Sequence, residues 1–255
     1  MIFIFIVSVF IVIQGVTRYQ KTGSVYQAIY LSKKHLHYLN TYFTFYQKLP
    51  PESKKVFSQR VARFITTKKF IARNIDSVSD EMKVLISASA IQLTFGFPKL
   101  QLSHFRIILV YPDAYYSTIN RTHHKGEVNP RLGAIVLSWK SFVEGYIHSD
   151  GRNLGLHEMA HALRLENKIT NEEYNFLDPQ ILKEWEIRAA HTMREIDEGR
   201  EEFFREYGAV NSEEFFAVAV ENFFEQPVRF LEKHPLTYTT LSKLLRQDPA
   251  LLEKP

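Results

Sequence analysis

Residues 157–161 read His-Glu-Met-Ala-His inside the apolar stretch LGLHEMAHAL, and this pentad constrains the fold more than any other segment of the 255-residue chain. Side chains four positions apart lie above one another on one helix face, so His157 and His161 can direct imidazole nitrogens at one metal ion. Neutral imidazoles suit zinc, and Glu158 would then point toward a water molecule held there. The flanking leucine, methionine and alanine residues leave little polar surface for two exposed histidines. The pattern therefore predicts a largely apolar helix that carries a metal-binding pair.

The third metal ligand must come from elsewhere in the chain. The sequence has no cysteine, and a catalytic zinc site usually has three protein ligands and one open position, so the third ligand must be His, Asp or Glu. Residues 213–226, EEFFAVAVENFFEQ, predict an apolar helix with Glu214 and Glu221 on one face. Carboxylates bracketed by phenylalanines are poorly explained as surface residues. We expect Glu214 to be the third ligand and Glu221 to orient a ligating imidazole through its other ring N–H.

Helices dominate the rest of the pattern, with two short strands between them. Hydrophobic spacing predicts helices over 52–73 and 80–93. Two continuous β-branched and aromatic runs, FRIILVY at 105–111 and LGAIVLS at 132–138, predict strands. From Asn153 onward helix signals resume. We therefore expect an α+β fold in which a small sheet covers the metal-binding helix.

The first 16 residues, MIFIFIVSVFIVIQGV, hold no charge and predict a membrane segment. A secretory signal peptide would place a basic residue before the apolar run and a cleavage site after it. Here the basic residues follow the run instead, at Arg18, Lys21, Lys33 and Lys34. A buried core helix is the less favoured alternative. Because positive residues stay on the cytoplasmic side, we expect an uncleaved transmembrane anchor over 1–17 in the inner membrane, with the remaining chain in the cytoplasm.

Charge is distributed unevenly along the chain. Residues 1–80 carry 12 Lys and Arg against 3 Asp and Glu, whereas the net charge of the whole chain is only +4. Between 18 and 49, aromatic residues alternate with basic ones, a mixture that could indicate stacking on nucleic acid. A helix that buries one face explains the same mixture, so we expect a basic, aromatic-rich helical region and no nucleic-acid partner. Pro50-Pro51 then begin the main domain, over 50–255.

A set of segments between about Leu49 and Pro249 forms a specific combination: FGFPK, VYPDAYY, LGAIVLSW, NLGLHEMAHAL, YGAVNSEEFFAVAVENFFEQP, HPLTY and LLRQDP. Together they resemble the Mlc titration factor A family of zinc-dependent peptidases, membrane-anchored bacterial members in particular. The resemblance implies a zincin-like fold and aminopeptidase-like hydrolysis of peptide bonds. Residue by residue, it implies zinc ligation by His157, His161 and Glu214, general-base catalysis by Glu158, and oxyanion stabilisation by Tyr207.

The reaction that this site implies is hydrolysis by a zinc-activated water, with Glu158 passing the water's proton to the leaving amine. We expect the strand at 132–138 to be the sheet edge along which an extended peptide or protein substrate pairs. The alternative is a membrane-tethered regulatory protein that sequesters a transcription factor and uses zinc mainly as a structural ion. Glu158 favours the enzyme, because a structural zinc site needs no carboxylate beside an open coordination position.

His123 and His124 lie between the two predicted strands, in the segment RTHHKGEVNP. The family resemblance implies a loop histidine that can close onto the metal in a resting state. The loop of this chain differs in length, which favours solvated loop residues. Both histidines are therefore left out of the predicted ligand set.

Overall fold

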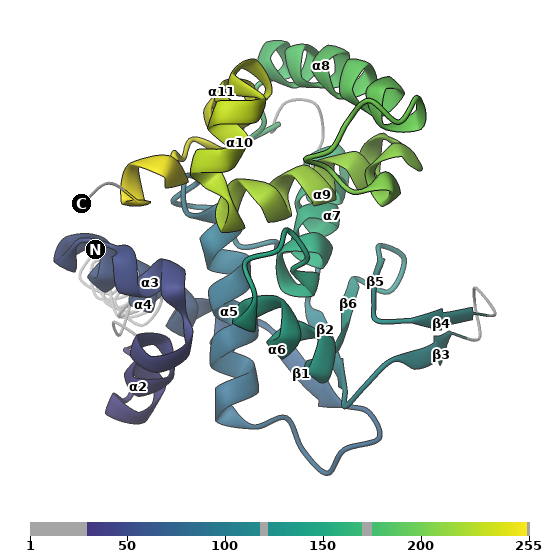
Figure 1. Cartoon of the computed structure of the whole chain (residues 1–255). Helices are drawn as coiled ribbons and strands as arrows, with labels where there is room; N and C mark the ends of the chain where they lie inside the picture. The colour runs from purple at the N-terminus through teal and green to yellow at the C-terminus, as the bar shows by residue number, and fades with distance from the viewer. Residues whose placement is uncertain (1–29, 118–121, 170–174, 254–255) are drawn as a thin grey trace, which may run out of the picture.

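The computed structural model describes residues 30–117, 122–169 and 175–253, which form a small mixed sheet and many helices (Figure 1). The anchor predicted at 1–17 lies outside the described residues, as does the adjoining segment 18–29. Within the described part of the chain, no helix is long and apolar enough to cross a membrane. The predicted α+β class, with a small sheet and many helices, is confirmed.

The sheet has four strands in the order β1 (Lys69–Ala72), β2 (Ile107–Tyr111), β6 (Ala134–Ser138) and β5 (Gly126–Asn129). β1, β2 and β6 run parallel, and Ile107 pairs with Lys69 on one side and Ala134 on the other. β5 pairs antiparallel with β6 and forms one edge of the sheet. A separate hairpin of β3 (Tyr115–Ser117) and β4 (Thr122–His124) projects beside the sheet (Figure 1).

The strand predicted at 132–138 is central rather than peripheral. β6 is buried along its whole length and lies between β2 and β5, so the prediction that it forms the docking edge is wrong. The edge beside it is β5, in a segment that was expected to be a loop. The four residues of β5, Gly-Glu-Val-Asn, are too few and too polar to show a strand pattern, and their pairing with β6 makes them a strand. His123 and His124 likewise lie on β4 rather than in a loop.

The helix predicted over 52–73 is two elements. α4 (Pro51–Thr67) ends where Lys68 becomes extended, and the chain continues as β1. The Lys68 ammonium is buried and donates hydrogen bonds to the carbonyl oxygens of Gln101 and Leu102, just before β2. This contact holds the junction beside β2, and tertiary pairing then converts the end of a helical pattern into the first strand.

The N-terminal described helices are α2 (Lys33–Tyr42) and α3 (Thr44–Lys48), and α2 contacts α5 (Asp80–Thr94). The rings of Phe43 and Tyr46 lie 6.0 and 5.6 Å from the ring of Phe57 on α4, within one hydrophobic core. This confirms that aromatic residues of the basic region take part in helical packing. The domain boundary placed between residues 49 and 50 stays a prediction.

The elements after β6 are α6 (Trp139–Ile147), α7 (Leu154–Ile169), α8 (Pro179–Asp197), η2 (Glu206–Ala209), α9 (Ser212–Glu225), α10 (Pro227–Lys233), α11 (Pro235–Leu245) and η3 (Pro249–Glu253). The side chains of Asp178 and Asn211 cap α8 and α9, and a proline begins each of α8, α10 and α11. α7 contacts β5, β6, α5 and α9 (Figure 1). This packing brings the His-Glu-x-x-His pentad and Glu214 together.

Candidate metal centre and active site

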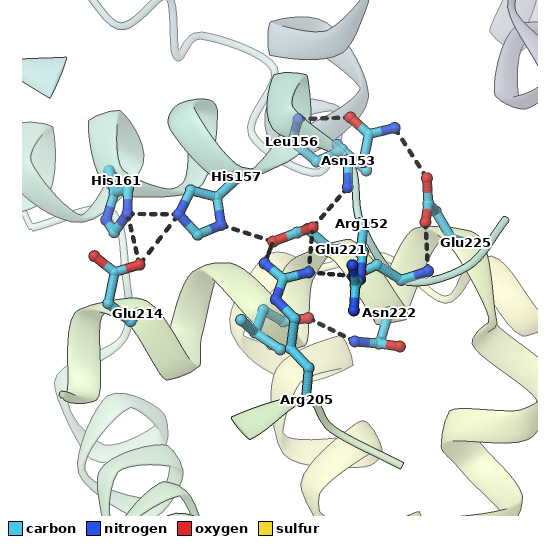
Figure 2. Close-up of polar contacts among 12 residues, drawn as sticks. Arg152, Asn153, Leu156, His157, His161, Arg205, Glu214, Glu221, Asn222 and Glu225 are labelled. Carbon is cyan, nitrogen blue, oxygen red and sulfur yellow. Dashed lines mark hydrogen bonds and ion pairs between the residues drawn. The ribbon is translucent and has the colours of Figure 1, made fainter. Parts of the chain in front are cut away.

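Three side chains from two helices converge at one point. His157 and His161 lie one turn apart on α7, and Glu214 lies in the first turn of α9, where its backbone N–H donates to the capping side chain of Asn211. His157 Nε2 is 3.1 Å from His161 Nε2 and 3.1 Å from Glu214 Oε2. His161 Nε2 is 3.5 Å from the same oxygen. The ligand atoms therefore form a compact triangle (Figure 2).

The triangle fits a metal ion. With zinc–ligand bonds of about 2.0–2.1 Å in tetrahedral geometry, ligand atoms lie roughly 3.3 Å apart, close to these separations. Glu214 Oε2 is buried beside the two imidazole nitrogens, a position at which a bound cation would neutralise its charge. Burial lowers the pKa of His157, but the carboxylates of Glu214 and Glu221 outweigh burial and raise it to about 10. Among the described residues, no other group of three His, Asp or Glu converges in this way.

A buried carboxylate orients His157 from the other side of the ring. Glu221 on α9 is only 1% exposed, and its Oε1 lies 2.6 Å from His157 Nδ1. Because a carboxylate only accepts, the ring carries a proton on Nδ1 and turns Nε2 toward Glu214. The two Nη groups of Arg205 donate to the two oxygens of Glu221 at 2.7 and 3.0 Å. The backbone N–H of Asn153 donates to the same carboxylate at 2.6 Å (Figure 2).

Asn153 also fixes the start of α7. Its side-chain oxygen accepts from the N–H of Leu156, and its side-chain amide donates to the Gly145 carbonyl and to Glu225 Oε1. Burial raises the pKa of Glu225, which lies one turn after Glu221, to about 8. The first turn of α7, which contains His157, is therefore joined to α9 by polar contacts as well as by apolar packing.

Glu158 follows His157 and is enclosed beside the triangle. Burial raises the pKa of its carboxyl to about 7, although His157 and His161 oppose this rise. Gly126 of β5 lies directly against this carboxylate, so that a Cβ built on the glycine would overlap with Glu158 Oε1. The strand backbone can pass this close because glycine has no side chain. A carboxyl held here with a pKa near neutrality is suited to accepting and returning a proton.

Tyr207 on η2 lies on the solvent side of the same site. Its side chain is about half exposed, and its ring centroid lies 6.1 Å from that of His157. Burial and the negative charge of Glu214 raise the pKa of its hydroxyl to about 12. Tyr207 therefore keeps its proton near neutral pH and can donate a hydrogen bond.

Two adjoining cavities open over the site. The larger has a volume of about 1110 Å³ and extends past β4 and the end of α6. The smaller has a volume of about 510 Å³ and extends along β5 toward the start of α9. Both are lined by His124, Gly126, His157, Glu158 and Tyr207. The candidate site thus lies where the two cavities meet.

The structure brings together all the residues predicted for the site. His157, His161 and Glu214 form the triangle, and Glu158 and Tyr207 line the same cavities. Their chemical roles stay predictions. The two neighbouring histidines are outside the triangle: His123 lines only the larger cavity, whereas His124 lines both and has a buried Nε2 without a hydrogen-bond partner.

Sequence reasoning missed Arg205, Asn153 and Gly126. An arginine two residues before Tyr207 and a glycine in a polar segment carry no local pattern, since their contacts depend on how η2 and β5 pack. Asn153 offered a usable signal, because an asparagine before an apolar helix is a favoured cap.

A family model described as glucose-regulated metallo-peptidase M90 matches residues 17–246. This chain belongs to the M90 metallopeptidase family. The match confirms the resemblance to the Mlc titration factor A family that the sequence segments indicated. Membership implies a metal ion and a peptide substrate, and the triangle provides a place for the metal ion.

Relatives of this M90 chain match it over most of their length. An uncharacterized protein of Synechocystis sp. is 26% identical over 223 residues, which is 81% of each chain. Mlc titration factor A of Salmonella agona is 29% identical over 209 residues, covering 74% of this chain and 77% of the relative. The protein of the same name from Klebsiella pneumoniae is 28% identical over 222 residues, covering 79% and 82%. The name of the last two suggests a regulatory role for those proteins.

Gly126→Ala tests the contact between β5 and Glu158. The added methyl group must displace the carboxylate or the strand, and a misplacement of about 1 Å can lower a rate on the order of 100-fold. We expect kcat to fall by about that factor while metal content, measured by elemental analysis, stays unchanged. Lys69→Ala is the control, because it changes an exposed residue of β1, the strand at the opposite edge of the sheet. Equal losses of kcat in the two variants would contradict this assignment.

Arg205→Ala tests the network behind His157. Loss of the guanidinium leaves Glu221 without its bidentate partner, and outer partners of this kind contribute about 10- to 100-fold to metal affinity. We expect zinc affinity, measured by competition with a chromogenic chelator, to fall within that range. Arg205→Lys should recover only part of it, because an ammonium cannot form the paired contact. Arg229→Ala, which removes an exposed arginine, should not change zinc affinity; an unchanged affinity in Arg205→Ala would remove Arg205 from the network.

Proposed function

We propose that this protein is a zinc-dependent peptidase in which His157, His161 and Glu214 hold the ion and Glu158 is the general base. The observation that carries the proposal is the position of Glu158. Its carboxyl is buried, interacts with the charges of His157, His161 and Glu214, and lines both cavities where they meet over the triangle. A site that held zinc only for stability would need no such group.

The chain's own residues account for the proton transfers of hydrolysis. Bound zinc supplies a Lewis acid that lowers the pKa of a water molecule and polarises the scissile carbonyl. Glu158 accepts a proton from the water as its oxygen bonds to the carbonyl carbon. It then delivers that proton to the departing nitrogen as the C–N bond breaks. Glu221 and Arg205 keep His157 in the tautomer that directs Nε2 at the ion.

An extended peptide is the substrate that the cleft fits. β5 is a sheet edge, and Gly126, Glu127 and Val128 line the smaller cavity. Main-chain pairing along such an edge would bind a peptide with little dependence on its sequence. The contact between Gly126 and Glu158 would place the paired backbone next to the general base.

Glu158→Gln is the decisive test of the reaction. The amide keeps the size of the side chain but cannot accept the proton, so zinc content should be retained while hydrolysis of a panel of small amide substrates falls at least about 100-fold. His157→Ala, His161→Ala and Glu214→Ala should each lose zinc instead. Unchanged hydrolysis in zinc-replete Glu158→Gln would refute the proposed general base.

We further propose that Tyr207 donates a hydrogen bond to the oxyanion that forms at the scissile carbonyl. Its hydroxyl keeps its proton because its pKa is raised to about 12, and its side chain lines both cavities with its ring centroid 6.1 Å from that of His157. Tyr207→Phe should lower kcat on the order of 100-fold with little change in KM, zinc content or melting temperature. A kcat near that of the wild type would remove Tyr207 from the catalytic set and leave the metal ligands unaffected.

A regulatory role is the alternative function, and the name Mlc titration factor A of the relatives supports it. In that case the chain would sequester a transcription factor and zinc would be mainly structural. The variants above separate the two functions, because a purely binding protein would have no amide hydrolysis for Glu158→Gln to remove.

We also propose that residues 1–17 anchor the protein in the inner membrane with the peptidase domain in the cytoplasm. Support comes from the uncharged apolar run and from the basic residues that follow it. Deleting residues 1–16 should release the protein from the membrane fraction and leave hydrolysis of small substrates intact. Protease added to spheroplasts should not digest the full-length chain, and digestion there would reverse the proposed orientation.

A further inference from the structure

Three basic side chains in the described part of the chain are buried, and one of them has no carboxylate partner there. Arg164 lies 3.4 Å from Glu213. Burial lowers the pKa of Lys68 to about 8, and the negative charge of Glu166 opposes that fall. Arg60 is only 7% exposed, and burial alone lowers its pKa, to about 10, so its guanidinium keeps its charge at neutral pH. Because a buried charge without an opposite charge is costly, Arg60 is a candidate group for binding an anion.

The hydrogen bonds of Arg60 go to neutral acceptors around the end of α5. Nη1 donates to the Phe95 carbonyl at 3.0 Å, and Nη2 donates to the carbonyl and hydroxyl oxygens of Thr94 at 2.8 and 3.0 Å. Nη2 also donates to the Leu100 carbonyl at 3.3 Å. Nε is buried and has no hydrogen-bond partner among the described residues. The Nη groups therefore join α4 to the chain that follows α5, while the charge and the Nε–H of Arg60 lack a matching acceptor in this part of the chain.

A cavity of about 270 Å³ is lined by Arg60 and opens between α4 and the chain that follows α5. Arg63, three residues farther along α4, also lines this cavity and is exposed. None of the described residues that line it is acidic; besides the two arginines they are Val56, Gln59, Phe95, Pro98 and Gln101. The cavity therefore carries positive charge and has an apolar part formed by the valine, phenylalanine and proline.

The donors of this cavity favour a tetrahedral anion over a planar one. A carboxylate binds an arginine best through two parallel N–H groups, but the Nη groups of Arg60 already donate to backbone carbonyls. A phosphate group has oxygens in several directions and can accept single hydrogen bonds from Arg60 Nε and from Arg63. Gln101 can add an amide N–H, because its buried side-chain oxygen has no partner among the described residues and rotation of the amide exchanges oxygen and nitrogen. The volume is below the roughly 300–1,000 Å³ of pockets for drug-sized ligands, so the cavity suits a small group.

We propose that the cavity between α4 and the chain that follows α5 binds a phosphate group through Arg60 and Arg63. Free phosphate and the headgroup of a phospholipid both offer this chemistry, and the experiment below distinguishes them. The proposal does not depend on the peptidase function, since neither arginine lines the two cavities over the metal triangle.

Calorimetric titration of the full-length protein in a non-ionic detergent tests the proposal. The probes are inorganic phosphate and glycerophosphoglycerol, the soluble headgroup of a phospholipid, both at constant ionic strength so that screening does not change. We expect saturable binding of at least one probe, with a Kd of about 1 mM or below. Tighter binding of inorganic phosphate would identify a free ligand, and tighter binding of the headgroup would identify a lipid. Acetate should bind at least about tenfold more weakly than the preferred probe, because the paired N–H groups that a carboxylate needs are occupied.

Two matched variants tie binding to this cavity. Arg63→Gln removes a charged donor from the cavity, so the affinity for the preferred probe should fall about tenfold or more. Arg73→Gln removes the same charge from an exposed residue outside the cavity and should leave the affinity unchanged. Arg60→Met should bind neither probe, provided that its circular dichroism spectrum matches that of the wild type.

Three results would each overturn the proposal. The first is the absence of saturable binding for both phosphate probes, the second is equal affinity in Arg63→Gln and Arg73→Gln, and the third is binding of acetate as tight as that of the preferred probe. Loss of Arg60 also removes the hydrogen bonds that join α4 to the chain after α5, so Arg60→Met can fail to fold. The test does not depend on that variant, because Arg63 and Arg73 are exposed and their replacement leaves the core intact.

Discussion

The hydrogen bonds of the buried Glu221 carboxylate are the interactions on which the geometry of the candidate site depends. An ion at this depth would cost several kcal/mol if it had no partners. Its partners come from separate parts of the chain: His157 and Asn153 at the start of α7, and Arg205 just before η2. The hydrogen bonds of this one carboxylate therefore connect three parts of the site: the helix that carries the pentad, the helix that carries Glu214, and the segment that carries Tyr207.

A second support reaches the site from the opposite direction. The backbone of β5 lies on Glu158, and β5 is held by its pairing with the fully buried β6. Polar contacts from α9 thus orient His157 of the candidate metal site, and a strand backbone lies against Glu158, the proposed general base. Groups that must work together are held by different elements of one rigid core, the arrangement that keeps a site at a fixed geometry.

Local patterns were enough to predict His157, Glu158, His161 and Glu214, whereas Tyr207 was predicted from the family resemblance. The i, i+4 spacing of His157 and His161 is a property of the helix alone, and the phenylalanines around Glu214 marked its helix as buried. The same kind of pattern placed the strand at 132–138 but gave its position in the sheet wrongly, because residue spacing carries no information about strand order. β1 and β5 were missed because each has only four residues and becomes a strand through pairing with a neighbour. Arg205 was missed for a similar reason, since its partner Glu221 is distant in sequence and close only in the fold.

The close approach of Gly126 to Glu158 has a consequence for how substrate preference can diverge among proteins with this arrangement. A peptide paired with β5, as proposed, would be positioned by hydrogen bonds between backbones, and Glu158 lies against that same strand backbone. The distance from the main chain of such a substrate to the proposed proton acceptor would therefore not depend on any side-chain rotamer of the strand. Residues farther along the cleft could then change in size or charge, and so change which peptide sequences bind well. The alignment of the scissile bond with Glu158 would stay the same.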